Sequence, residues 1–309
     1  MTATLSDMIN EVSMNLSGYT LTQDRSTYLR TAVTGTTSSS ASPTVLSLGS
    51  TENVGKGIVE IDEELLWIDT YDRVGNTATV APYGRGYLGT TAATHALDAK
   101  VTISPTFPKF SIKRAINDTI KGLSGILFAA DTTTITYSSA VSTYRLPATG
   151  DSLGIRNILS VAYESIGPSK EWIPIRSWRF DSNANSTAFT SEQTISIYDM
   201  ITSGRTIQIV YSKDPTPFST NADVFTTKTG LPESCRDLVI TGSIYRLLSN
   251  LDPARAATVS AQADETDSKR PYGSSQSLTR QIYALYTQRL AEEVKSQQNK
   301  YPIRVHYSL

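Results

Sequence analysis

Apolar residues recur at three- and four-residue steps in four parts of the chain, and this spacing predicts four amphipathic helices. The predicted helices cover residues 5–16, 109–128, 231–248 and 278–299. Pro108 lies just before the second helix and Pro302 follows the last one. Proline is common at the start of a helix, where Pro108 lies, and it stops a helix that it follows, as Pro302 does. Both prolines therefore support the predicted boundaries.

Short apolar or alternating runs, separated by Gly, Asn and Asp turn residues, predict strands in the two parts between these helices. The runs are residues 44–48, 57–61, 65–70 and 77–81 in the first part, and 135–137, 158–163, 172–175, 195–198 and 207–211 in the second. Strands and helices are segregated rather than alternating. This order favours an α+β fold with largely antiparallel sheets over a doubly wound fold.

We therefore expect a helical bundle core with two inserted, mostly antiparallel β modules and an extended C-terminal tail, because insertions at exposed loops are well tolerated. The expected parts are an N-terminal helical part (residues 1–33), a small β module (34–107), a core helix (108–130), a larger β module (131–220), C-terminal core helices (221–300) and a tail arm (301–309). Eight of the eleven residues from 34 to 44 are Ser or Thr, which predicts a flexible connector from the first helix to the small sheet.

Composition excludes several classes of protein. The 309 residues include 28 Lys and Arg against 29 Asp and Glu, so the basic surface of a protein that grips nucleic acid through phosphates is not expected. One cysteine and two histidines exclude an internal disulfide and a four-ligand Cys/His zinc site. No apolar run approaches the roughly 18 residues that span a bilayer, and the N-terminus lacks a leader pattern, so we expect a chain that is cytosolic when made and has no membrane partner.

Two glycine motifs suggest chemistry that their surroundings do not support. Residues 150–154 match the G-x-S-x-G serine elbow of hydrolases, but only His95 and His306 are available as a base, and neither has an acid at a triad spacing. A turn is the simpler interpretation of Ser152. Residues 84–89 match the dinucleotide-binding G-x-G-x-x-G, but no long helix follows them, so we expect no cofactor.

Acidic and aromatic side chains offer weaker candidates. The densest acidic stretch contains Glu60, Asp62, Glu63, Glu64 and Asp69. Because acids alternate with apolar residues there, we interpret the stretch as the solvated face of a strand and a turn, and we assign no metal site.

Trp172 and Trp178 could stack on sugars, although aromatic residues in strands are more often packed in a core. Cys235, early in a predicted helix, is interpreted as a buried small hydrophobe, and we assign no catalytic residue.

Residues 83–96, with the order Tyr-Gly-Arg-Gly-Tyr-Leu-Gly-Thr-Thr-Ala-Ala-Thr-His-Ala, follow the acidic and aliphatic residues 63–68 and precede the β residues 101–103. This order resembles a recurrent module of phage tail and head-to-tail proteins. The residues that carry it, which we predict to form a structural turn, are Gly84, Arg85, Gly86, Gly89, Thr90 and His95. Glycine permits backbone angles closed to other residues, and Thr90 or Thr91 can cap a short helical turn that ends near His95.

The wider frame is similar to head-to-tail adaptor (connector) proteins of long-tailed bacteriophages. The similar segments are the N-terminal helix, residues 110–128 with Ala115-Ile116-Asn117, and residues 231–239. Simple adaptors in this group are mostly small helical proteins, so two β insertions make this chain an elaborated relative. The resemblance implies a virion (neck) protein that is not an enzyme.

As an adaptor, the chain would form a ring of about a dozen copies of itself. Its partners would be the portal protein, a stopper or tail-terminator protein and possibly the capsid, and double-stranded DNA would pass through without specific binding. The tail residues proposed for assembly are Tyr301, Ile303, Arg304, Val305, His306, Tyr307 and Leu309, which mix apolar, aromatic and basic types suited to a neighbour's sheet or groove.

Three alternatives stay open. A tail or neck component could carry the same β cassette. From other classes come a serine esterase that uses Ser152 and a carbohydrate-binding β module that uses Trp172 and Trp178. The low charged fraction of 18%, against about 25% in typical globular proteins, favours a subunit that neighbours cover on several sides.

Overall fold

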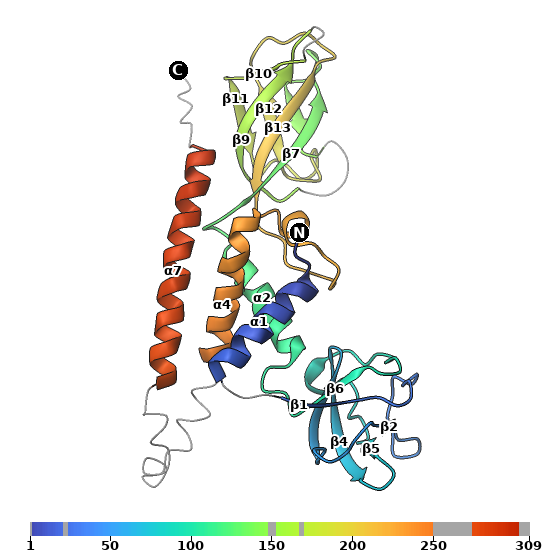
Figure 1. The fold of residues 1–309 in the computed structure, drawn as a ribbon. Coiled ribbons are helices and arrows are strands. Elements are labelled where there is room, and N and C mark those ends of the chain that lie inside the picture. Colours follow the sequence, from blue (N-terminus) through green and yellow to red (C-terminus); the bar gives the residue numbers. More distant parts are fainter. Residues whose placement is uncertain (1, 21–23, 148–152, 167–169, 250–273, 303–309) are drawn as a thin grey trace. The chain divides into compact units, whose positions relative to one another are not determined.

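The computed structural model describes residues 2–20, 24–147, 153–166, 170–249 and 274–302. It contains both helices and β-sheets (Figure 1), which confirms the α+β class. The helices are α1 (Leu5–Thr20), α2 (Lys109–Gly122), α3 (Phe225–Thr229), α4 (Arg236–Ser249) and α7 (Ser274–Lys300), with the short 3₁₀ turns η1 (Tyr87–Gly89) and η2 (Glu233–Cys235).

The chain divides into two compact units, each assembled from separate stretches. One unit comprises Met1–Leu5, Asn117–Val239 and Tyr283–Leu309, and the other comprises Ser6–Ile116 and Ile240–Ile282. The division falls within α1, α2, α4 and α7, and both units are rich in β-sheet. A helical bundle as the common core therefore stays a prediction, as do the domain limits expected from the sequence.

The helices form where the apolar spacing predicts them. In α1, all five apolar stripe residues are buried, at most 4% exposed: Leu5, Met8, Ile9, Val12 and Leu16.

The prediction for α2 was wrong at its end, because the helix stops at Gly122 rather than near residue 128. Leu123 and Leu127 keep the apolar spacing and are buried, but Gly125 takes a left-handed φ of 89° that ends helical backbone. Spacing alone does not distinguish a last helical turn from a turn that buries the same residues.

The first β module is a closed six-stranded antiparallel barrel. Its strands are β1 (Arg25–Tyr28), β2 (Val45–Ser47), β3 (Gly57–Ile61), β4 (Glu64–Asp72), β5 (Thr77–Val80) and β6 (Lys100–Ile103), in the order β1-β6-β3-β4-β5-β2. The two end strands meet through the bridge between Leu29 and Leu48, with the Arg30 amide donating to the Ser47 carbonyl at 2.8 Å. Closure leaves no strand edge unpaired along this seam.

The predicted role of residues 34–44 as a connector from helix to sheet was wrong, because β1 comes before them and pairs with β6. Within this stretch, Ser38 is 4% exposed, and its hydroxyl donates to the Val80 carbonyl and accepts from the Thr44 amide. The stretch is therefore a loop of the barrel. The barrel interior is filled by buried aliphatic side chains, among them Leu46, Ile61, Leu66, Ile68 and Val101.

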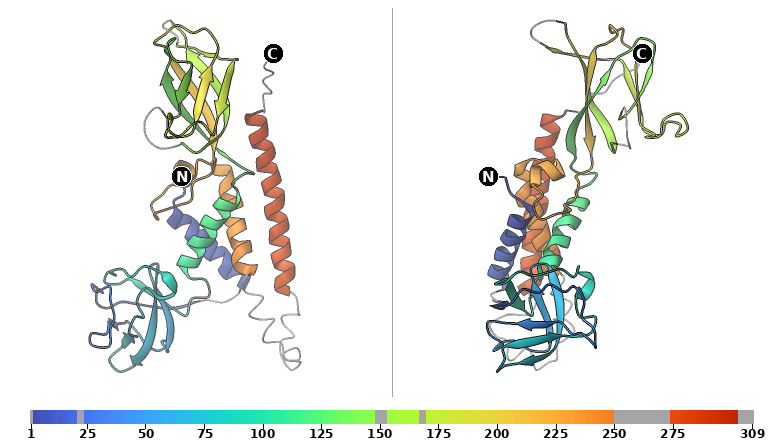
Figure 2. Two further views of the ribbon diagram at one scale, coloured as in Figure 1. Left: turned by 180° about the vertical axis from the view of Figure 1, so that it is seen from behind. Right: turned by 90° about the vertical axis from the view of Figure 1, so that its right-hand side faces the viewer.

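The second β module is a sandwich of two antiparallel sheets, which Figure 2 shows from two further sides. Its strands are β7 (Ala129–Thr136), β8 (Thr143–Arg145), β9 (Ile155–Glu164), β10 (Trp172–Pro174), β11 (Trp178–Asp181), β12 (Thr194–Ile197) and β13 (Thr206–Lys213). The four-stranded sheet has the order β10-β9-β13-β7, and the three-stranded sheet has the order β11-β12-β8. Val161 and Ile209 from the larger sheet share one core with Ile195 from the smaller sheet.

Candidate functional site

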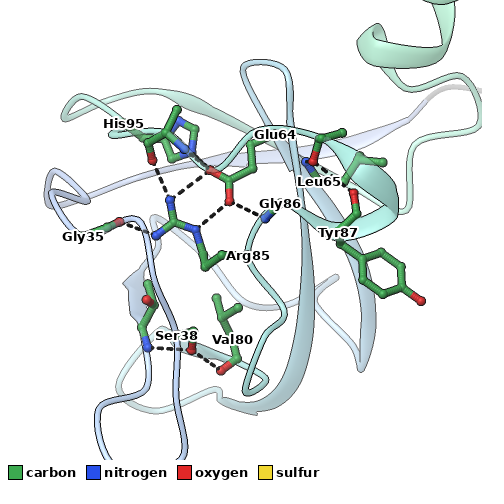
Figure 3. Close-up of polar contacts among 12 residues, drawn as sticks. Gly35, Ser38, Glu64, Leu65, Val80, Arg85, Gly86, Tyr87 and His95 are labelled. Carbon is green, nitrogen blue, oxygen red and sulfur yellow. Dashed lines mark hydrogen bonds and ion pairs between the residues drawn. The ribbon is translucent and has the colours of Figure 1, made fainter.

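A buried carboxylate, Glu64 at the start of β4, organises the barrel end that carries the glycine-rich turn (Figure 3). Its side chain is 1% exposed. One carboxylate oxygen accepts hydrogen bonds from Arg85 Nε at 2.6 Å and the Gly86 amide at 2.9 Å. The other oxygen accepts from Arg85 Nη2, the Ala93 amide and His95 Nε2, each at 2.9 Å.

Arg85 links this carboxylate to two backbone segments. Its guanidinium holds Glu64 in a two-pronged ion pair and donates further hydrogen bonds to the carbonyls of Gly35 and Ala93. The Arg85 side chain is only 2% exposed. Planar bidentate pairs of this kind are strong and specific in geometry, so one side chain ties the loop of residues 34–44 to the segment after η1.

His95 completes the network and balances its charge. Its Nδ1 lies 2.8 Å from Asp62 Oδ2 and its Nε2 lies 2.9 Å from Glu64 Oε2. Ionised carboxylates only accept hydrogen bonds, so both ring nitrogens must donate and the ring carries a positive charge. Two acids, one arginine and one imidazolium then sum to no net charge.

The pKa shifts of the two central groups agree with this arrangement. Burial alone raises the pKa of Glu64, but the hydrogen bonds that it accepts outweigh burial and lower the pKa to about 2. Burial lowers the pKa of His95, but its hydrogen bonds to Glu64 and Asp62 outweigh burial and raise the pKa. The stabilisation from Glu64 is therefore lost as pH falls below its ordinary value of 4.5, and that from His95 is lost as pH rises through its raised pKa.

The interpretation of residues 60–64 as a solvated acidic face was wrong for two of the acids. Glu64 is buried in the network, and Glu60 on β3 is 4% exposed. Glu60 accepts a hydrogen bond of 2.5 Å from the Lys109 amide at the start of α2, and burial raises its pKa to about 7. The alternation of acidic and apolar residues identified the two faces of β3, but it did not reveal that both faces are covered.

Two glycines of the turn have a position that a side chain would not fit. A Cβ on Gly84 would lie 2.9 Å from the carbonyl oxygens of Trp67 and Ala81, and one on Gly86 would lie 2.7 Å from the Thr90 carbonyl oxygen. Gly86 also has a left-handed φ of 60°. The role of this turn as a purely structural element stays a proposal, which these contacts support.

Thr90 has a different place from the one expected. The short helical turn η1 comes before Thr90 rather than after it, so neither Thr90 nor Thr91 caps a turn that ends at His95. The Thr90 hydroxyl donates to the Tyr87 carbonyl at 3.0 Å and accepts from the Leu65 amide at 3.1 Å. Thr90 thereby fastens η1 to the first residues of β4, and Gly89 precedes it with a left-handed φ of 82°.

The turn displays two large apolar side chains to solvent on unusual backbone. Tyr83 and Leu88 have left-handed φ values of 58° and 54° and are 90% and 65% exposed. Such backbone costs roughly 1–3 kcal/mol for a residue other than glycine and persists only where the surroundings impose it. The hydrogen bonds from Arg85 and the Gly86 amide to Glu64, made between these two residues, supply a constraint of that kind.

The groups that a dinucleotide-binding loop or an esterase would need are engaged in these structural contacts. The Gly86 amide, which a dinucleotide loop would aim at phosphate, donates to Glu64 instead. Both nitrogens of His95 are engaged in the barrel network, so this histidine is not available as a base for an esterase. Ser152 and His306 lie outside the described residues.

Cys235 and the two tryptophans have positions that favour packing. Burial and the nearby Glu293 carboxylate raise the pKa of the Cys235 thiol to about 12, so a reactive thiolate is not supported. Trp178 packs against the sandwich core, whereas Trp172 on β10 is 42% exposed. Among the described residues, no three His, Cys, Asp or Glu side chains are placed to share a metal ion.

The predicted assembly arm is described only at its beginning. Tyr301 packs against Phe128, with ring centroids 5.8 Å apart. The other predicted arm residues, Ile303, Arg304, Val305, His306, Tyr307 and Leu309, lie outside the described residues.

The polar side chains around Glu64 are engaged in contacts within the barrel. The sequence model of the SU10 adaptor protein family matches residues 88–305, which is more than half of the chain. The chain therefore belongs to the SU10 adaptor protein family, a family of phage structural adaptor proteins, and this membership implies a virion-associated protein and points to a non-enzymatic one. No curated protein sequence matches the chain.

The matched region begins at residue 88, inside η1, so strands β1 to β5 precede it. Most of the barrel is thus additional to the part that carries the family signal. None of the described helices combines the length and apolar character needed to cross a bilayer.

We predict that Arg85→Met destabilises the barrel strongly, because it leaves the buried Glu64 charge without its main partner. The expected loss is about 3–5 kcal/mol of unfolding free energy, measured by urea denaturation. Lys56→Met is the matched control, since it breaks an exposed ion pair with Asp69 and should cost at most about 1 kcal/mol. Equal losses in the two variants would contradict the structural importance of the buried pair.

We predict that Glu60→Gln removes part of the pH dependence of stability. The folded pKa of about 7 lies above the ordinary 4.5, so Glu60 makes the parent protein less stable as pH rises between these values, by up to about 3 kcal/mol. Urea unfolding at pH 5 and pH 8 should show that the free energy of unfolding falls less between these pH values for Glu60→Gln than for the parent. The exposed Glu52→Gln serves as the charge control and should retain the parent's drop; an identical drop in all three proteins would refute the assignment.

Proposed function

We propose that this protein is a head-to-tail adaptor that forms a ring of about a dozen copies between the portal and the stopper or tail of a long-tailed phage. The observation that carries the proposal is membership of the SU10 adaptor protein family over residues 88–305. The portal protein and a stopper or tail-terminator protein are the proposed neighbours, and the neck of the virion is the proposed location.

The charge balance supports a channel that DNA passes through rather than one that binds it. Lys and Arg number 28 against 29 Asp and Glu, and neutralising many phosphates would hold DNA in place. A near-neutral subunit therefore suits a channel through which DNA slides. The low charged fraction of 18% also suits a subunit with extensive protein contacts, because few charges have to be desolvated.

Residues 301–309 are the proposed contact arm to a neighbouring virion protein. Its root is anchored, since Gln297 near the end of α7 exchanges two hydrogen bonds with the Phe128 backbone and Tyr301 packs on the Phe128 ring. These contacts hold Tyr301, the first residue of the proposed arm, in place.

We expect the purified chain to bind portal rings of the same phage and to give a complex whose mass corresponds to a ring of many copies. A chain that ends at Lys300 should bind at least about tenfold more weakly, because it lacks the arm. Mass measurement of the complex and titration against portal check both statements. Ser152→Ala is the control and should assemble like the parent; a full-length chain that stays free in excess portal would overturn the adaptor function.

A further inference from the structure

The two outer strands of the four-stranded sandwich sheet differ in length and composition. On one side β10 has three residues and contains Pro174, which has no amide hydrogen to offer. On the other side β7 has eight residues, and from Thr132 to Ser138 the chain contains no proline, glycine or charged residue. Long edge strands that lack such residues pair readily with another strand, and native proteins usually protect them.

Pairing with β13 determines which backbone groups of β7 point outward. The Tyr137 amide donates to the Arg205 carbonyl, and the antiparallel register continues from there along the strand. Backbone groups alternate between the two sides of a strand, so the amides and carbonyls of Thr134 and Thr136 point away from β13. Both residues are exposed, and among the described strands β13 is the one that pairs with β7. We call Thr134 and Thr136 the open window of β7.

The outward amides on either side of the open window are already engaged by side chains. The Thr132 amide donates to the Asp131 carboxylate at 2.8 Å. The Ser138 amide donates to the Tyr144 hydroxyl at 2.9 Å. Within the part of the chain that the structure describes, the outward groups of the open window have no such partner. The edge that is ready to pair is therefore short and has defined ends.

The open window is self-complementary about a two-fold axis at Ile135. When two β7 strands pair antiparallel around that axis, Thr134 of each copy lies opposite Thr136 of the other. Each copy offers two amides and two carbonyls there, so every outward group of the window meets a partner. The two threonine side chains also form a favourable cross-strand pair.

The charges near the open window permit this approach. The nearest charged side chain on β7 is Asp131, which forms an ion pair with Lys213. Around an axis at Ile135 the Asp131 residues of the two copies are eight positions apart, which is about 26 Å at roughly 3.3 Å per residue. This separation is well beyond the Debye length of about 8 Å at physiological salt, so their repulsion is largely screened.

We propose that two free copies of this chain pair through their β7 strands, antiparallel and centred on Ile135, and so join their four-stranded sheets into one sheet. A second copy fits because its own edge carries the same window between the same engaged amides, so neither strand leaves an outward group of the window unpaired. A two-fold pair does not extend into a ring with one rotation axis, so the pairing belongs to the subunit before assembly. It rests on the sandwich and not on the proposed adaptor ring.

Sedimentation of the purified full chain, without any phage partner, tests the pairing. The parent should form a dimer, and Thr134→Pro should weaken it at least about tenfold, because it removes an outward amide without removing a bond to β13. Thr132→Pro is the matched control, since its amide lies outside the open window, and it should dimerise like the parent. A parent that stays monomeric, or a Thr134→Pro dimer as strong as the parent's, would overturn the proposal.

Amide hydrogen exchange identifies the strand that pairs. The Thr134 and Thr136 amides should exchange at least about tenfold more slowly at concentrations where the dimer forms than after dilution to the monomer. The Thr133 and Ile135 amides, which face β13, should not change and serve as the internal control. Protection of the open window that persists in the monomer would show that another part of the same chain covers this edge, and it would overturn pairing between copies.

A mixture of two cysteine variants tests the register. Directly opposite residues have Cα atoms about 5.5 Å apart, within the range of a disulfide, whereas diagonal neighbours are about 7–8 Å apart. Thr134→Cys and Thr136→Cys chains should therefore cross-link faster when mixed than either variant does alone, because only the mixed dimer places the two cysteines opposite each other. Equal rates in the mixture and in the separate variants would overturn the register centred on Ile135.

Discussion

An ionised carboxylate that is 1% exposed is stable in a fold only when nearby groups satisfy its charge and its lone pairs. Glu64 imposes this requirement on the barrel. Its donors come from Arg85 and His95 and from the amides of Gly86 and Ala93, so the turn after β5 and the segment before β6 must both close on the start of β4. The left-handed backbone of the turn and the close approach at its glycines are consequences of that closure.

The two β modules solve the problem of exposed strand edges differently. The barrel joins its end strands through Leu29 and Leu48, so its outward features are loops. Among the described residues the sandwich keeps open edges: β10 is short and contains Pro174, whereas β7 has eight residues and no proline. In a protein of a phage adaptor family, a closed module and an open module offer different kinds of contact: side chains on turns from the first, and backbone pairing from the second.

The candidate site shows where inference from sequence ends. The order Tyr83 to His95 identified a turn built on glycines, Arg85 and His95, and the structure places these residues together around one acid. The acid itself was misassigned, because Glu64 ends the acidic run of residues 62–64, which is typical of a solvated turn. The residues next to Glu64 in the sequence do not indicate that Arg85 is its partner. Arg85 is 21 positions away and reaches Glu64 only once the barrel closes. The glycine and arginine spacing was the one available signal that a buried counter-charge was needed.

The sequence by itself determined the long helices and most of the strands in their order, since apolar spacing of three and four along α1 and α2 and of two along the strands depends on the geometry of each segment alone. It did not reveal β1, β8 or β11. It also determined the α+β class, because helices and strands are grouped rather than interleaved. Only the tertiary structure decided that β1 closes a barrel with β2, that α2 stops at Gly122 despite the buried Leu123 and Leu127, and which acids are buried. These outcomes depend on contacts between residues distant in the chain, and periodicity carries no information about such contacts.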